Sequence, residues 1–127
     1  MTWFKNYKLN KLTNKLADLN AEKEDLLQII STVENVGVVE AAKILTESAT
    51  VDTRKYKLFR KARNQLDNWE RYCGWSEDYF NHSPKERKDK MIKILSEEVL
   101  TTERRIEWTE ILIRELNFEI YRGKPLW

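Results

Sequence analysis

Residues 83–125 read SPKERKDKMIKILSEEVLTTERRIEWTEILIRELNFEIYRGKP, and this stretch decides the fold. Ser83 is a typical N-cap, Pro84 suits the first position of a helix, and Glu86 stands where a capping box needs an acid. No further glycine or proline follows until a Gly-Lys-Pro stop signal. We therefore predict one helix over 84–122, which would be roughly 58 Å long at about 1.5 Å per residue.

Two sets of apolar side chains run along this predicted helix. The first set recurs at alternating steps of three and four, as in a helix that packs against another helix. Its members are Ile92, Leu95, Val99, Thr102, Ile106, Thr109, Ile113, Leu116 and Ile120. The second set, Trp108, Ile111 and Phe118, projects onto the opposite side at about 100° per residue. We expect the second half of the helix to be covered on two sides, with a second subunit as one source of cover.

The earlier part of the chain predicts two more long helices, at about 3–34 and 53–73. Their stripes also step by three and four, and Lys23 interrupts the first one. The stripe residues are Leu9, Leu12, Leu16, Leu19, Leu26, Ile30 and Val33 in the first, and Phe59, Ala62, Leu66, Trp69 and Cys73 in the second. Gly37 should break or bend the path between them. A short helix is expected near 38–48, with a short strand as the alternative.

Composition points to the same fold class. The chain has 127 residues, 35% of them charged, with only three glycines and two prolines. These proportions are typical of long helices. We predict an all-α protein: an elongated helical bundle or coiled-coil-like assembly, forming a single helical domain over residues 1–127.

The residue types needed for catalysis or metal binding are scarce. His82 and Cys73 are the single histidine and the single cysteine. One of each cannot build a structural zinc site, and no phosphate-binding glycine loop is present. The acids of the last helix alternate with arginines, which is typical of a solvated face with i,i+4 ion pairs. We predict no catalytic residue, cofactor or metal and no enzyme activity. The alternative is a metal-dependent enzyme that uses Glu103, Glu107 or Glu110.

Basic residues are concentrated in the second predicted helix. Residues 52–73 hold seven Lys or Arg and three acids, whereas the whole chain has a net charge of +2. Four of the basic residues lie away from the apolar stripe: Arg54, Lys57, Arg60 and Lys61. This basic face could contact nucleic acid or an acidic partner. The alternative is an ordinary solvated face, or one that faces acids of a neighbouring helix.

Aromatic residues gather at both ends of the chain. Trp3, Phe4 and Tyr7 lie off the leucine stripe and are surrounded by lysines, and Trp127 is the last residue. The N-terminal rings either fold back onto the core or form an exposed patch. An exposed aromatic cluster rimmed by charge is typical of a surface that binds a partner protein. A membrane-surface anchor is the weaker alternative, because tryptophan and lysine also suit a lipid interface.

These patterns favour a non-enzymatic helical module for protein–protein interaction: an adaptor, inhibitor or assembly factor that docks sterically on its partner. The expected partner-binding residues are Trp3, Phe4, Tyr7, Trp108, Ile111, Phe118 and Trp127. We also expect a homo-oligomer, with a dimer first. The composition, rich in Lys, Asn and Ile, suggests a phage or mobile-element accessory protein. A nucleic-acid-binding protein is the alternative function. The single cysteine and the lack of a long apolar run predict a cytoplasmic protein.

Overall fold

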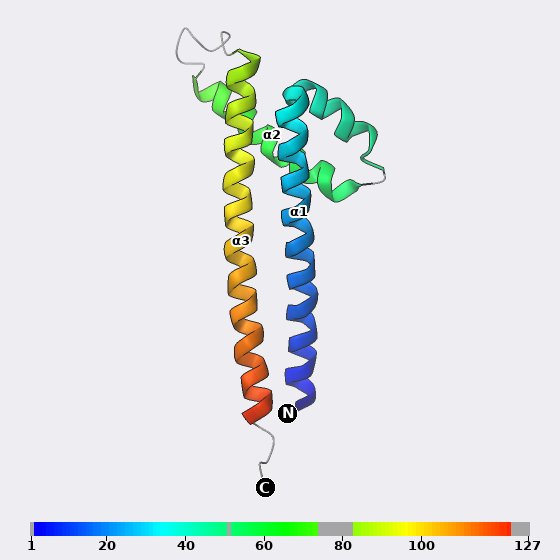
Figure 1. Cartoon of the computed structure of the whole chain (residues 1–127), viewed down its shortest axis with the longest axis vertical. Coiled ribbons are helices and arrows are strands. Elements are labelled where there is room, and N and C mark those ends of the chain that lie inside the picture. Colours follow the sequence, from blue (N-terminus) through cyan, green and yellow to red (C-terminus); the bar gives the residue numbers. More distant parts are fainter. Residues whose placement is uncertain (1, 51, 74–82, 123–127) are drawn as a thin grey trace. The chain divides into compact units, whose positions relative to one another are not determined.

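The computed structural model describes residues 2–50, 52–73 and 83–122. The regular structure of these residues is entirely helical (Figure 1). In chain order the helices are α1 (Thr2–Glu47), α2 (Thr53–Cys73) and α3 (Pro84–Arg122). The prediction of an all-α helical bundle is confirmed. The alternative of a strand near 38–48 is wrong, because α1 continues through these positions.

Local capping explains where α2 and α3 begin. The Lys55 backbone N–H donates a hydrogen bond to Asp52 Oδ1 at 3.3 Å. The Glu86 backbone N–H donates to Ser83 Oγ at 3.1 Å, which confirms the predicted N-cap of α3. The return bond of a full capping box, from the Ser83 N–H to the Glu86 carboxylate, is not among the hydrogen bonds of the described residues. α3 then runs without interruption to the predicted end of the helix.

Gly37 divides α1 into two helical stretches. Its backbone has φ 82° and ψ 174°, which lies outside the helical region and is essentially restricted to glycine. Beyond the adjoining backbone, no heavy atom of the described residues lies within 4 Å of the position that a Cβ would occupy there, so the glycine is needed for its backbone conformation and not for lack of space. Both the predicted break and the short helix that follows it are confirmed.

The chain divides into two compact units. We refer to residues 1–23 with 101–127 as the two-helix unit, and to residues 24–100 as the three-helix unit. α1 and α3 contribute to both units, whereas α2 belongs wholly to the second. The single-domain organisation and the elongated form stay predictions.

The three-helix unit contains a continuous apolar core. It takes side chains from both stretches of α1, from α2 and from the first half of α3. The buried members are Leu26, Ile29, Val33, Val38, Ala41, Leu45, Phe59, Ala62, Leu66, Met91, Ile94, Leu95 and Val99. Most of them lie on the predicted stripes. In α3, Met91 and Ile94 lie off the predicted stripe, and they show that this part of the helix is covered over a wider arc than one heptad stripe.

Candidate protein interface

The two-helix unit is an antiparallel pair. Lys5 Nζ lies 4.0 Å from Glu119 Oε2, and Lys23 Nζ lies 3.3 Å from Glu103 Oε1, so early residues of α1 lie beside late residues of α3. The buried side chains between the helices come from the predicted stripes and are Leu19, Thr102, Ile106, Thr109 and Leu116. The Lys23 ammonium thus joins the two helices by an ion pair at the edge of the stripe.

A pair of helices covers each helix on one side only. The outer side of α1 carries Trp3, Phe4 and Tyr7, and Trp3 is 76% exposed. Since α1 is already helical at Thr2, these rings project from regular helix and do not fold back, so the core alternative is wrong. The Trp3 and Tyr7 rings stack with their centroids 6.2 Å apart.

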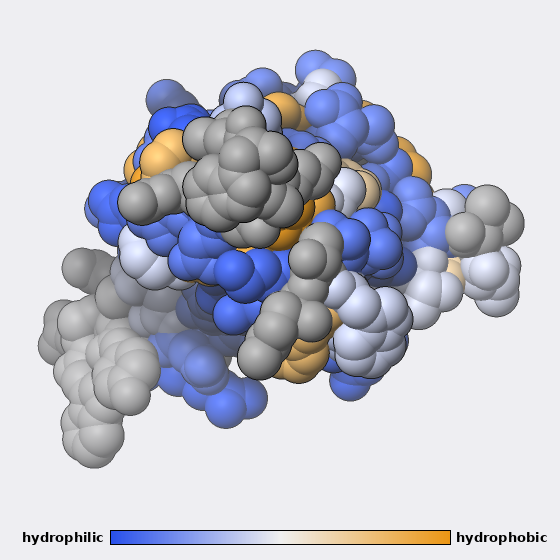
Figure 2. All heavy atoms as spheres, turned by 90° about the horizontal axis from the view of Figure 1, so that it is seen from below, coloured by the Kyte–Doolittle hydropathy of each residue, from blue (hydrophilic) through white to orange (hydrophobic). Residues whose placement is uncertain are grey.

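The aromatic cluster at the start of α1 has a basic rim. Lys11 Nζ lies 5.2 Å from the centroid of the Tyr7 ring, within the range of a cation–π contact. Figure 2 looks onto the end of the two-helix unit where α1 begins, and apolar side chains show between hydrophilic ones there. An exposed aromatic cluster beside cations suits binding to a partner with both apolar and acidic groups.

The outer side of α3 carries the second set of large apolar side chains. Trp108 is 60% exposed, and Ile111, Phe118 and Tyr121 are also exposed. The sequence predicts that this second side of α3 is covered. The described residues of one chain do not cover it. Tyr121 was missed by the sequence reasoning, although it lies one turn beyond Phe118 and its ring is as large.

Charged residues surround Trp108 and Ile111 on the same side of α3. Arg104, Glu107, Arg114 and Glu115 are all exposed. None of these four makes an ion pair with another described residue. The predicted i,i+4 pairing on this face is therefore wrong. The four side chains are solvated, as the sequence predicts, and their heptad spacing relative to Trp108 places them beside one stripe of the helix.

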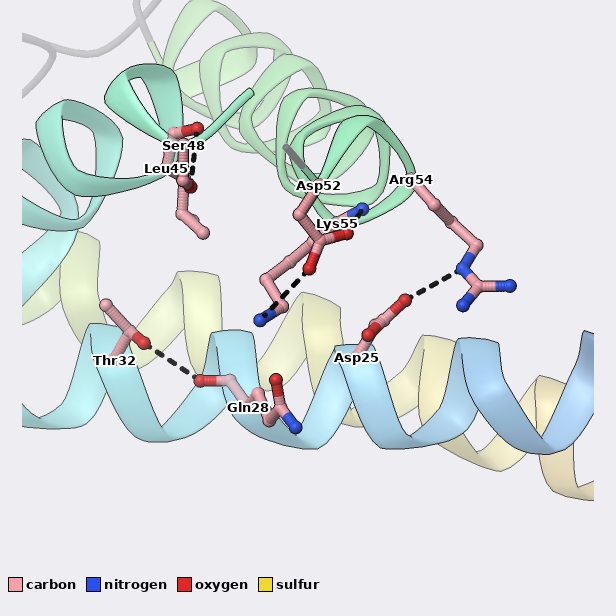
Figure 3. A network of polar contacts seen from close by, with 8 residues as sticks. All are labelled: Asp25, Gln28, Thr32, Leu45, Ser48, Asp52, Arg54 and Lys55. Atoms are coloured by element: carbon pink, nitrogen blue, oxygen red, sulfur yellow. Dashed lines mark hydrogen bonds and ion pairs between the residues drawn. The ribbon is translucent and has the colours of Figure 1, made fainter. Parts of the chain in front are cut away.

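The predicted basic face of α2 is partly used within the chain. Arg54 Nε lies 2.8 Å from Asp25 Oδ2, as Figure 3 shows, and Lys61 Nζ lies 3.4 Å from Glu98 Oε1. Lys57 and Arg60 are exposed and form no ion pair with a described residue. Two of the four basic residues thus fit the alternative reading, in which the face meets acids of neighbouring helices.

A hollow of about 430 Å³ in the three-helix unit was not predicted. Its lining includes apolar side chains of the short helix after Gly37, such as Val38 and Ala42, together with Arg63 and Arg87. The Arg87 guanidinium already pairs with the Glu70 carboxylate, so it is not a free anion-binding group. Its lining also includes Lys43, Thr46 and Glu47, but among the described residues no hydrogen bond joins the Thr46 hydroxyl to a base.

The three glutamates of the alternative enzyme hypothesis do not form a common site in the described structure. Glu103 pairs with Lys23, and Glu107 and Glu110 are exposed. Within the described ranges no group of three or more His, Cys, Asp or Glu side chains could hold a metal ion. His82 and Trp127 lie outside the described residues, and the side chain of Cys73 is not described either.

No helix in the described part of the chain combines the length and the apolar character needed to cross a membrane. Comparison of the chain with protein-family models, with curated proteins and with solved structures finds no match. The chemistry of the exposed faces is therefore the ground for a functional proposal.

Proposed function

We propose that this chain is a non-enzymatic helical module that binds proteins through the outer faces of its two-helix unit. The observation that carries the proposal is the exposure of large rings on regular helix, with Trp3 at 76% and Trp108 at 60%. Tryptophan is enriched among the residues that contribute most to protein–protein binding. A rigid helix presents such rings without the ordering cost of a loop.

The mechanism that follows is steric docking. A partner that covers an outer face removes exposed aromatic area from water and leaves the charged rim to select orientation. A chain acting this way would be an adaptor, an inhibitor or an assembly factor, and its composition leads us to propose a phage or mobile-element origin. We propose the cytoplasm as its compartment, because a single cysteine suits a reducing environment.

Affinity capture with matched variants tests this function. The interface variant combines Trp3→Gln, Tyr7→Gln and Trp108→Gln, since glutamine preserves helix propensity. The control variant combines Val39→Gln, Ile44→Gln and Leu100→Gln, which are exposed apolar residues of the three-helix unit. Each chain is immobilised on a support and incubated with an extract of the source cells. We expect the wild type and the control to retain a protein that the interface variant loses. If all three chains retain the same proteins, and light scattering finds the wild type monomeric at high concentration, the proposal is wrong.

Nucleic-acid binding is the second candidate, and it is favoured by Lys57 and Arg60, two exposed cations that form no ion pair with a described residue. A gel shift with duplex DNA at several salt concentrations tests it. Lys57→Ala with Arg60→Ala should weaken binding and lower the salt slope by about 0.9 per lost phosphate contact. Lys8→Ala with Lys15→Ala removes the same charge from α1 and is the control. Equal binding by the two double variants would exclude the α2 face as the site.

A further inference from the structure

We infer that the outer face of α3 binds the same face of a second copy of this chain, with the two α3 helices antiparallel. This inference rests on the proposed function and names one partner for it. It starts from four exposed residues, Arg104, Trp108, Ile111 and Glu115. They follow one another at steps of four, three and four, which is the spacing of a second coiled-coil stripe opposite the one that packs on α1.

Two-fold symmetry fixes which residues of such a pair lie opposite each other. In a two-fold contact, residue i of one copy meets residue j of the other, and j meets i. When the axis passes between Thr109 and Glu110, Trp108 lies opposite Ile111 of the second copy. The same axis places Arg104 opposite Glu115 of the second copy. Each apolar side chain then meets an apolar one, and each charge meets its opposite, twice per dimer.

The flanking charges agree with the same register. Glu107 and Arg114 stand beside the stripe on the same edge of the helix. With the two-fold axis between residues 109 and 110, Glu107 and Arg114 of the second copy are offset by about 3 Å along the helix axis. Neither residue has an ion-pair partner among the described residues of its own chain. Two further opposite-charge pairs therefore form at the rim.

Competing registers bring unlike groups or like charges together. A parallel pair would place Arg104 against Arg104 and Glu115 against Glu115, which is repulsive. Antiparallel pairs shifted by one heptad would place Ile111 against Glu115 in one direction and Arg104 against Trp108 in the other. Only the unshifted antiparallel register matches every one of the four residues, so charge specifies both direction and alignment.

The size of the contact predicts a reversible dimer. Large aromatic side chains bury about 150–250 Å² each when fully covered. Because Trp108 and its neighbours are about half exposed, roughly 300 Å² of apolar side-chain area per copy is available for this contact. A standard stable interface buries about 800 Å² per partner, of which somewhat over half, about 450 Å², is apolar, so the available apolar area is smaller. We therefore expect association that depends on concentration and weakens with salt.

Charge reversal tests the register directly. Arg104→Glu and Glu115→Arg each create two like-charge pairs per dimer, and sedimentation equilibrium should show at least about 10-fold weaker self-association for each. An equimolar mixture of the two variants restores both opposite-charge pairs in a heterodimer, so the mixture should associate within about threefold of the wild type. Glu110→Arg, a charge reversal at an exposed residue about 130° around the helix axis from this stripe, is the control and should leave the association unchanged. Circular dichroism verifies the fold of each variant.

The outcomes separate this inference from the proposed function. Recovery in the mixture, without recovery of either variant alone, supports the register. Weak association in the mixture overturns it. If the wild type is monomeric at all concentrations but still captures a protein through the Trp3 and Trp108 faces, self-pairing is wrong and the interaction function stands. If neither self-association nor capture is observed, both proposals fail.

Discussion

Replacing Thr102 by valine should make the protein more stable, by about 1–2 kcal/mol. Thr102 lies on α3 in the two-helix unit, and its exposed fraction is 0%. Its Oγ1 has no hydrogen-bond partner among the described residues. Thr109, one heptad further on, is buried as well, but its Oγ1 donates a hydrogen bond to the Arg105 carbonyl oxygen at 2.7 Å.

The magnitude follows from this contrast. A buried hydroxyl without a partner costs about 1–3 kcal/mol of desolvation free energy. Valine has nearly the same shape and nearly the same helix propensity as threonine, so Thr102→Val removes that cost without opening a cavity. Thr109→Val removes a satisfied hydroxyl, and we expect a change of about 0.5 kcal/mol or less, in either direction. The difference between the two variants is the informative quantity.

Urea titration followed by far-UV circular dichroism measures both variants. Thr102→Val should raise the midpoint without changing the slope, and a thermal scan should show an increase of about 2–6 °C. If Thr102→Val is no more stable than the wild type, the hydroxyl is satisfied in solution. If Thr109→Val gains as much as Thr102→Val, polarity and not the missing hydrogen bond explains the effect. Either result would refute the reasoning.

Three further substitutions test the fold. Gly37→Ala should destabilise by about 1–3 kcal/mol because its backbone conformation excludes a Cβ, whereas Val36→Ala next to it should be nearly neutral in the same urea titration. Leu66 is 0% exposed, so Leu66→Ala should lower the free energy of unfolding by about 2–5 kcal/mol. Leu100 is exposed, so Leu100→Ala should lower it by less than about 0.5 kcal/mol. Equal effects of the two substitutions would contradict the described core. Arg54→Ala leaves the Asp25 carboxylate buried without its cation and should cost about 1–2 kcal/mol. Asp25→Asn in the same background should recover part of this loss, and no recovery would exclude the ion pair as the cause.

The limits of the helices were largely contained in the sequence. Ser83 and Pro84 mark the start of α3, and Gly37 marks the break in α1, as the structure confirms. Such signals depend on the conformation of a few consecutive residues and on hydrogen bonds within one turn. The exposure of Trp108 and Ile111 is different, because a heptad pattern says which residues share a face and not what covers it.

Only the tertiary structure decided which faces are used inside the chain. Arg54 and Asp25 are 29 residues apart in sequence, and no local pattern pairs them. The same holds for the two stripes of α3: both have the spacing of a buried seam, but α1 occupies one and leaves Trp108 in solvent. Periodicity is a property of one helix, whereas burial depends on the neighbour that packs against it. The sequence by itself therefore determined the helices and their apolar faces, and packing determined which face stayed free to bind.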